Sequence, residues 1–264
     1  MTSGKRQLAR GIALFALGML FTGAACSSAD DSPGADLDGG AFGASDGGGA
    51  KSGDASTSSC LPGDVSTFTG GDYHPPTGAH QGKCDDDGIE AYVDCRKNSN
   101  PVSCEYITTG EGAGCLPCIE TASSAAAWGP VVLSGSSDAT AFVNEPGCLA
   151  LALGEGTSAQ GCGASLQKAM NCEAAACGVN CAGASAAAAT ACAETAENSG
   201  CSAFTAAATT ACAVDAGGAQ DLCYMQTTED GGPAESEFDY AARVAKFFCG
   251  FPSVTADAGT GDGG

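Results

Sequence analysis

GASLQKAMNCEAAACG, residues 163–178, carries the features that decide the fold of this chain. One face of the helix that it predicts is made by Leu166, Ala169, Met170 and Cys177. Its apolar positions hold mainly alanine and cysteine. Alanine runs at 184–196 and 202–213 predict two more helices, because alanine has the highest helix propensity. The chain is therefore expected to be helical wherever this composition recurs.

Helical spacing of apolar residues marks two further segments. Residues 89–96 form one, with Asp87 as its N-cap and Glu90 completing a capping box. Residues 238–249 form the other, an apolar stripe preceded by Ser236 as a cap. Acidic residues at the start of this last helix and basic residues near its end suit the helix macrodipole.

The segment between these helices gives weaker signals. Residues 119–127 are expected to form a short helix, and only 129–133 and 140–143 suggest strands. We therefore predict an all-α, disulfide-stapled domain with long loops.

Seventeen cysteines constrain how the domain is held together. Apart from Cys26 they are even in number, which predicts eight disulfides, each contributing on the order of 2–4 kcal/mol to a core lean in large side chains. The pairing stays open, since sixteen cysteines allow about two million complete pairings. The predicted disulfide residues are Cys60, Cys84, Cys95, Cys104, Cys115, Cys118, Cys148, Cys162, Cys172, Cys177, Cys181, Cys192, Cys201, Cys212, Cys223 and Cys249.

Residues 1–25 have the pattern of an export signal. Three basic residues precede an apolar run that is shorter than the ~20 residues needed to span a bilayer. Gly23-Ala-Ala-Cys26 resembles a bacterial lipobox, with glycine at the usual leucine position, and this implies a diacylglycerol on the sulfur of Cys26. Cleavage after Ala25 without lipidation is the alternative.

The charge of the chain excludes several partners. Ten basic and 31 acidic residues give a net charge of −21. Because residues 1–25 hold three bases and no acid, their removal takes this to −24. Such a surface repels nucleic acid and anionic lipid head groups, so membrane attachment is expected to come from acyl chains.

Composition divides the chain into four parts. The signal peptide is followed by a lipidated cysteine and a disordered Gly/Ser/Asp tether, residues 26–59, which has too few apolar side chains to fold. As a flexible coil this tether spans roughly 30 Å. Residues 60–255 form the cysteine-rich helical domain, and residues 256–264 a disordered tail.

Short motifs around the cysteines carry a family resemblance. They are Gln81-Gly-Lys-Cys84, Ile89-Glu-Ala-Tyr-Val-Asp-Cys95, Cys115-Leu-Pro-Cys118, Trp128-Gly-Pro, Asn144-Glu-Pro-Gly-Cys148, Cys172-Glu-Ala-Ala-Ala-Cys177-Gly-Val-Asn-Cys181 and Phe247-Phe-Cys249-Gly. Over about residues 80–250, their order resembles cysteine-rich secreted lipoproteins of myxobacteria and related soil bacteria. The resemblance implies an extracytoplasmic location and this fold, and it supplies no catalytic residues.

Cys115-Leu-Pro-Cys118 is the sharpest enzymatic candidate. A C-x-P-C motif before a helix lowers a thiolate pKa in thioredoxin-like oxidoreductases. However, no βαβ pattern surrounds it, and short spacings also arise where each cysteine pairs elsewhere.

Two motifs suggest metals. His74 and His80, with Asp72, offer ligands for Zn²⁺ or Cu²⁺, although adjacent prolines predict an exposed loop. Asp85-Asp-Asp-Gly88 is similar to part of a calcium loop, but Lys83 stands at the first ligand position, so helix capping is the better interpretation. We expect no resident metal or cofactor.

The leading hypothesis is a non-enzymatic, lipid-anchored protein of the outer membrane or cell surface. Its domain would be structural or bind a protein or carbohydrate partner. The alternatives are a thiol–disulfide redox protein using Cys115 and Cys118 and a metal-binding protein using His74 and His80. P-loop and zinc-protease motifs are absent from the sequence.

Overall fold

The computed structural model describes residues 60–134, 140–213, 217–228 and 232–252. The predicted signal peptide, Cys26, the tether and the tail lie outside these residues. The first half contains α2 (Asp86–Asn98), α3 (Pro101–Thr108), the 3₁₀ helix η1 (Glu111–Gly114), α4 (Leu116–Ile119), β1 (Glu120–Ala122), β2 (Val131–Ser134) and β3 (Thr140–Val143). The second half contains α5 (Glu145–Ala152), α6 (Cys162–Cys177), α7 (Ala186–Glu197), α8 (Ser202–Ala211), α9 (Gly217–Cys223) and α10 (Glu237–Cys249).

A three-stranded sheet corrects the all-α prediction, although the fold is mostly helical. β2 is central, pairing in parallel with β1 and antiparallel with β3. The two segments that suggested strands are β2 and β3. Val131, Val132 and Val143 are buried, and such β-branched side chains fit a pleated, buried surface.

The predicted helix over residues 119–127 is wrong. α4 ends at Ile119, and the next three residues pair with β2 instead, with Glu120 opposite Val131. The Glu120 carboxylate also forms an ion pair with Arg96 and accepts a hydrogen bond from Tyr92 at 3.1 Å. Tertiary contacts of this kind override the helix propensity of the alanines that follow.

α2 begins earlier than expected. Its N-cap is Asp85, whose side chain accepts a hydrogen bond from the Gly88 amide at 2.8 Å, and Asp87 lies inside the first turn. The predicted cap at Asp87 was therefore two residues late. An acidic first turn favours either position through the macrodipole, so spacing alone did not decide between them.

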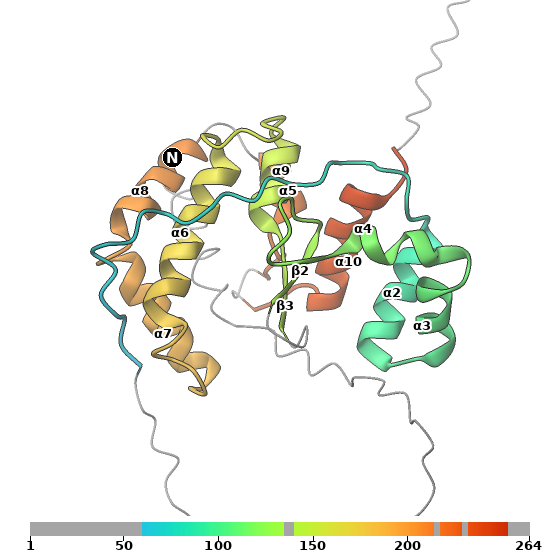
Figure 1. The fold of residues 1–264 in the computed structure, drawn as a ribbon, viewed down its shortest axis with the longest axis horizontal. Coiled ribbons are helices and arrows are strands. Elements are labelled where there is room, and N and C mark those ends of the chain that lie inside the picture. Colours follow the sequence, from blue (N-terminus) through green and yellow to red (C-terminus); the bar gives the residue numbers. More distant parts are fainter. Residues whose placement is uncertain (1–59, 135–139, 214–216, 229–231, 253–264) are drawn as a thin grey trace, which may run out of the picture.

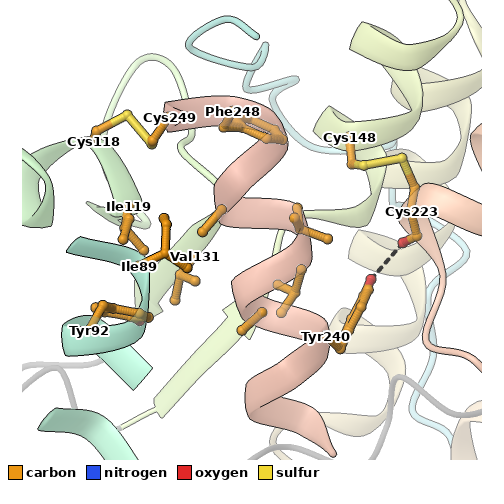
Figure 2. Close-up of a cluster of buried hydrophobic side chains, with 14 of the residues drawn as sticks. Ile89, Tyr92, Cys118, Ile119, Val131, Cys148, Cys223, Tyr240, Phe248 and Cys249 are labelled. Carbon is orange, nitrogen blue, oxygen red and sulfur yellow. Dashed lines mark hydrogen bonds between the residues drawn. A yellow bond between two sulfur atoms is a disulfide. The ribbon is translucent and has the colours of Figure 1, made fainter. Parts of the chain in front are cut away.

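The described residues form two hydrophobic cores, and α6 contributes to both, through Leu166 in one and Cys172 in the other. The main core joins α2, α5, α10 and the sheet, and its largest fully buried side chains include Tyr240, Phe248, Ile119 and Leu149. Figure 2 shows α10 in its middle, with the Cys118–Cys249 and Cys148–Cys223 disulfides on either side. The alanine–cysteine core lies among α6, α7 and α8, and its buried members are Cys172, Ala176, Cys177, Cys192, Ala196 and Cys201.

A long segment without helices or ladder strands, residues 60–84, connects the two cores; we call it the strap. In Figure 1 it runs from the side of α6, α7 and α8 across to α2. Its backbone bonds at 2.8 Å from the Gly63 amide to the Ala176 carbonyl, and at 2.9 Å from the Cys84 amide to the Cys249 carbonyl. A disulfide holds each end, Cys60–Cys181 at one and Cys84–Cys115 at the other.

Candidate functional site

Every cysteine of the described residues lies in a disulfide. The eight pairs are Cys60–Cys181, Cys84–Cys115, Cys95–Cys104, Cys118–Cys249, Cys148–Cys223, Cys162–Cys212, Cys172–Cys201 and Cys177–Cys192. This confirms the predicted disulfide-rich framework. Disulfides in this number indicate an oxidising, extracytoplasmic environment.

The two cysteines of the C-x-P-C motif are not bonded to each other. Cys115 bonds to Cys84 in the strap, and Cys118 bonds to Cys249 at the end of α10. Both sulfurs are buried, with Cys115 only 1% exposed. A dithiol couple needs its two cysteines bonded to each other and one of them accessible. The geometry therefore gives the predicted redox pair no support.

His74 and His80 contact different parts of the fold. His74 stacks on Trp128, with ring centroids 4.4 Å apart, and its Nδ1 lies 2.7 Å from the Ala125 carbonyl oxygen. His80 is exposed and meets the ring of Phe247 edge-on at 5.2 Å. Among the described residues, neither belongs to a cluster of three metal-ligating groups. Their contacts are those of strap residues that pack on the sheet and on α10.

The acidic run Asp85–Asp87 lies at the N-terminus of α2, with Asp86 and Asp87 in the first helical turn. Asp85 caps α2, and a hollow along α2 is lined by residues that include Asp87, Glu90 and Lys97. Asp94, also in the hollow, accepts hydrogen bonds from Asn98 and Ser103 at 2.7 and 2.6 Å, and these bonds lower its pKa. Its carboxylate thus joins α2 to α3, and its bonding capacity is largely used within the fold.

A buried carboxyl group lies beside the Cys148–Cys223 disulfide. Glu145, 5% exposed at the start of α5, lies 3.0 Å from the hydroxyl of Tyr240, which also lies 2.6 Å from the Cys223 carbonyl oxygen (Figure 2). A carbonyl can only accept, and tyrosine has one proton to donate. If Tyr240 donates to Cys223, a protonated Glu145 can donate to Tyr240.

Burial supports this protonated form. Loss of solvation is the largest influence on Glu145, and it raises the pKa of this carboxyl well above its ordinary value. Burial raises the pKa of Tyr240 as well, so the phenol stays neutral. The Tyr240 hydroxyl thus links α5, α9 and α10.

A second buried acid lies in the alanine–cysteine core. Glu173 on α6 is 6% exposed, and its Oε1 has no hydrogen-bond partner among the described residues. Burial, together with the nearby charge of Glu197, raises the pKa of Glu173 to about 8. The local sequence does not indicate that either glutamate is buried, because Glu173 precedes a run of alanines and Glu145 follows the helix-capping Asn144. Sequence reasoning therefore missed them.

The closest gathering of sulfur atoms lies where the strap begins. The Sγ atoms of Cys60, Cys181 and Cys192 all lie within 4.8 Å of one another. They belong to two disulfides, Cys60–Cys181 and Cys177–Cys192. The Cys177-x₃-Cys181 spacing was visible in the sequence, but nothing there placed residue 60 against it.

None of the helices in the described parts of the chain is long and apolar enough to cross a membrane. Comparison of the chain with family models, curated proteins and solved structures gives no match.

Proposed function

We propose that the chain is an exported lipoprotein whose disulfide-clamped domain serves as a structural or partner-binding module at the outer membrane or cell surface. Cys26 would carry the acyl anchor, and residues 27–59 would hold the domain away from the head groups. A protein or carbohydrate would be the partner, and the family resemblance to myxobacterial lipoproteins belongs to the same proposal. In this view the domain's role is to present a durable surface rather than to perform chemistry.

The observation that carries the proposal is the complete pairing of the sixteen cysteines from Cys60 to Cys249. No other cysteine of this chain remains to pair with Cys26. An unpaired thiol is uncommon in an oxidising compartment, and acylation removes it. The same pairing supports a structural use of Cys115 and Cys118.

The disulfide cross-links support a role in which the domain presents a stable surface to a partner. Disulfides tie both ends of the strap and link α10 to α4, so the two cores are joined covalently as well as by packing. A domain of this kind tolerates an exposed position on a tether because its unfolded state is restricted by cross-links. Its strongly acidic surface favours a cationic or a neutral polar partner over a polyanion.

Membrane partitioning of a Cys26→Ser variant tests the anchor. The native chain should enter the detergent phase of a Triton X-114 separation, and its mature N-terminal peptide should begin at Cys26 with the mass of a diacylglycerol. The Cys26→Ser chain should move to the aqueous phase. Ser27→Ala, the neighbouring change, is the control and should partition like the native chain.

Two results would refute the anchor. One is a Cys26→Ser chain that stays in the detergent phase. The other is a native N-terminal peptide that begins at Cys26 without lipid, which would mean cleavage after Ala25 and release of the domain.

A further inference from the structure

Two disulfides lie against each other at the start of the strap. Cys192 Sγ lies within 4.8 Å of both sulfur atoms of the Cys60–Cys181 bond, and Cys192 is itself bonded to Cys177. It is the one such three-membered sulfur group found in the described part of the chain. If the Cys60–Cys181 bond opened, the released thiolate could therefore reach Cys192 of the second disulfide by rotating its side chain.

The two bonds differ in access. Cys60 and Cys181 are half-buried, whereas Cys192 is 1% exposed and Cys177 is 7% exposed. Exchange begins by attack of a thiolate on an accessible disulfide sulfur, so a reagent from solution meets the Cys60–Cys181 bond first. The inner bond can then be reached through the outer one.

The surrounding contacts keep the sulfur atoms together after the outer bond opens. Next to Cys60, the Leu61 carbonyl accepts a hydrogen bond from the Asn180 side chain at 3.2 Å, and the Gly63 amide donates to the Ala176 carbonyl at 2.8 Å. Cys60 Sγ lies 3.3 Å from the carbonyl oxygen of Ala188, one helical turn before Cys192 on α7. The strap thus remains seated on α6 and α7 without its disulfide.

We propose that Cys60, Cys181, Cys192 and Cys177 form a thiol–disulfide exchange site that accepts small dithiols as reductants. It is independent of the lipid anchor, and it is separate from Cys115 and Cys118, whose disulfides lie in the main core. The site would move a reducing equivalent from the surface to the interior of the α6–α7 hairpin.

The reaction balances in two stages. A dithiol thiolate attacks Cys60 Sγ and Cys181 leaves as a thiolate; the second thiol of the reagent then closes the reagent's own disulfide and releases Cys60. The Cys181 thiolate next attacks Cys192 Sγ, forms a Cys181–Cys192 bond and expels Cys177 as a thiolate. One dithiol is oxidised, one protein disulfide is lost, and a free thiol has moved to Cys177. Attack by Cys60 instead of Cys181 gives Cys60–Cys192 and the same free Cys177.

A single substitution tests the second stage without any reductant. In Cys60→Ser the Cys181 thiol is free beside an intact Cys177–Cys192 bond. After alkylation and localisation by fragment-ion mass spectrometry, label should appear on Cys177 at no less than about a tenth of its level on Cys181, since exchange between similar thiols lies near balance. Cys181→Ser frees Cys60 and should likewise label Cys177.

The matched control is Cys95→Ser. The Cys95–Cys104 disulfide is half-buried like the outer bond of the site, but it has no third sulfur beside it among the described residues. Its freed Cys104 should hold all the label. The proposal fails if label in Cys60→Ser stays on Cys181 and label in Cys181→Ser stays on Cys60.

The native chain provides the test should either variant fail to fold. With one equivalent of dithiothreitol, label should appear on Cys177, and a Cys60–Cys192 or Cys181–Cys192 cross-linked peptide should accompany it. Label confined to Cys60 and Cys181, or distributed equally over Cys95 and Cys104, would overturn the exchange site.

Discussion

The main core and the alanine–cysteine core stabilise their helices by different means. The first buries large side chains such as Tyr240, Phe248 and Leu149. In the second, every buried member is alanine or cysteine, and three disulfides cross it: Cys60–Cys181, Cys172–Cys201 and Cys177–Cys192. Small side chains remove little apolar area from water, at about 25 cal/mol per Å². Cross-links that restrict the unfolded chain compensate for that deficit.

Phe248→Ala should have the largest effect, because it leaves a cavity in the main core. Phe248 is fully buried on α10, and phenylalanine-to-alanine changes at such positions cost about 3–5 kcal/mol. Urea unfolding without reductant measures the loss. Phe251→Ala, at a side chain that is 63% exposed, is the matched control and should cost under ~0.5 kcal/mol. Equal losses in the two variants would mean that aromatic burial does not set the stability of this core.

Removing the Cys172–Cys201 disulfide with a double alanine substitution should loosen the other core. The bond closes a separation of 29 residues, and the loop-entropy model gives about 3–4 kcal/mol. Amide hydrogen exchange should show α7 and α8 losing protection while α10 keeps it. The comparison is the Cys95–Cys104 pair, separated by nine residues, whose loss should cost about 1 kcal/mol less. Equal deprotection of α7 and α10 would show that the two cores unfold as one unit.

The buried Glu173 of the alanine–cysteine core should make the free energy of unfolding depend on pH. Glu173 has a pKa of about 8 when folded against an ordinary value of 4.5, so between these values the folded chain holds a proton that the unfolded chain lacks. The free energy of unfolding should therefore fall as pH rises through this window, by at most ~1.4 kcal/mol per pH unit for one proton.

Glu173→Gln should remove that part of the slope and leave the contribution of Glu145, which has the same sign in the main core. Glu105→Gln, at an exposed residue of α3, should leave the slope unchanged. Urea midpoints between pH 5 and 8 provide the measurement. An unchanged slope in Glu173→Gln would mean that the buried carboxyl is ionised in the fold.

Removing the N-caps of α10 and α7 should have the smallest and most local effects on stability. Ser236 caps α10 in a capping box with Asp239, and Ser185 caps α7 by accepting a hydrogen bond from the Ala188 amide. Alanine at either position should cost about 1 kcal/mol. Hydrogen exchange should report the Ser236→Ala loss in α10 and the Ser185→Ala loss in α7. A loss that spreads to the other helix in either variant would again argue against two separable cores.

Much of the helical architecture was predictable because it rests on local chemistry. Alanine propensity and apolar spacing predicted α6, α7, α8 and α10, and Ser236 was identified as a cap from its position alone. The disulfide-rich character also followed from cysteine number. Each of these depends on residues within a few positions of one another or on counting, so no distant contact had to be known.

The sheet and the buried acids could not be predicted in this way. β1 exists because Glu120 and its neighbours meet β2, which begins eleven positions later in its register. Tertiary packing buries Glu145 and Glu173, with Tyr240 of α10 bonded to Glu145 and Glu197 of α7 near Glu173, and this burial raises the pKa values of both carboxyls. A carboxylate in an alanine-rich helix is otherwise expected in water.

The sequence by itself determined that this is an acidic, cysteine-rich chain with alanine-rich helical segments and an odd number of cysteines. Only the tertiary structure decided which sulfurs bond. It separated Cys115 from Cys118 and placed Cys60 beside Cys181 and Cys192. The physical reason is that a disulfide requires its two Cα atoms within about 7 Å, and the approach of residues more than a hundred positions apart is set by packing.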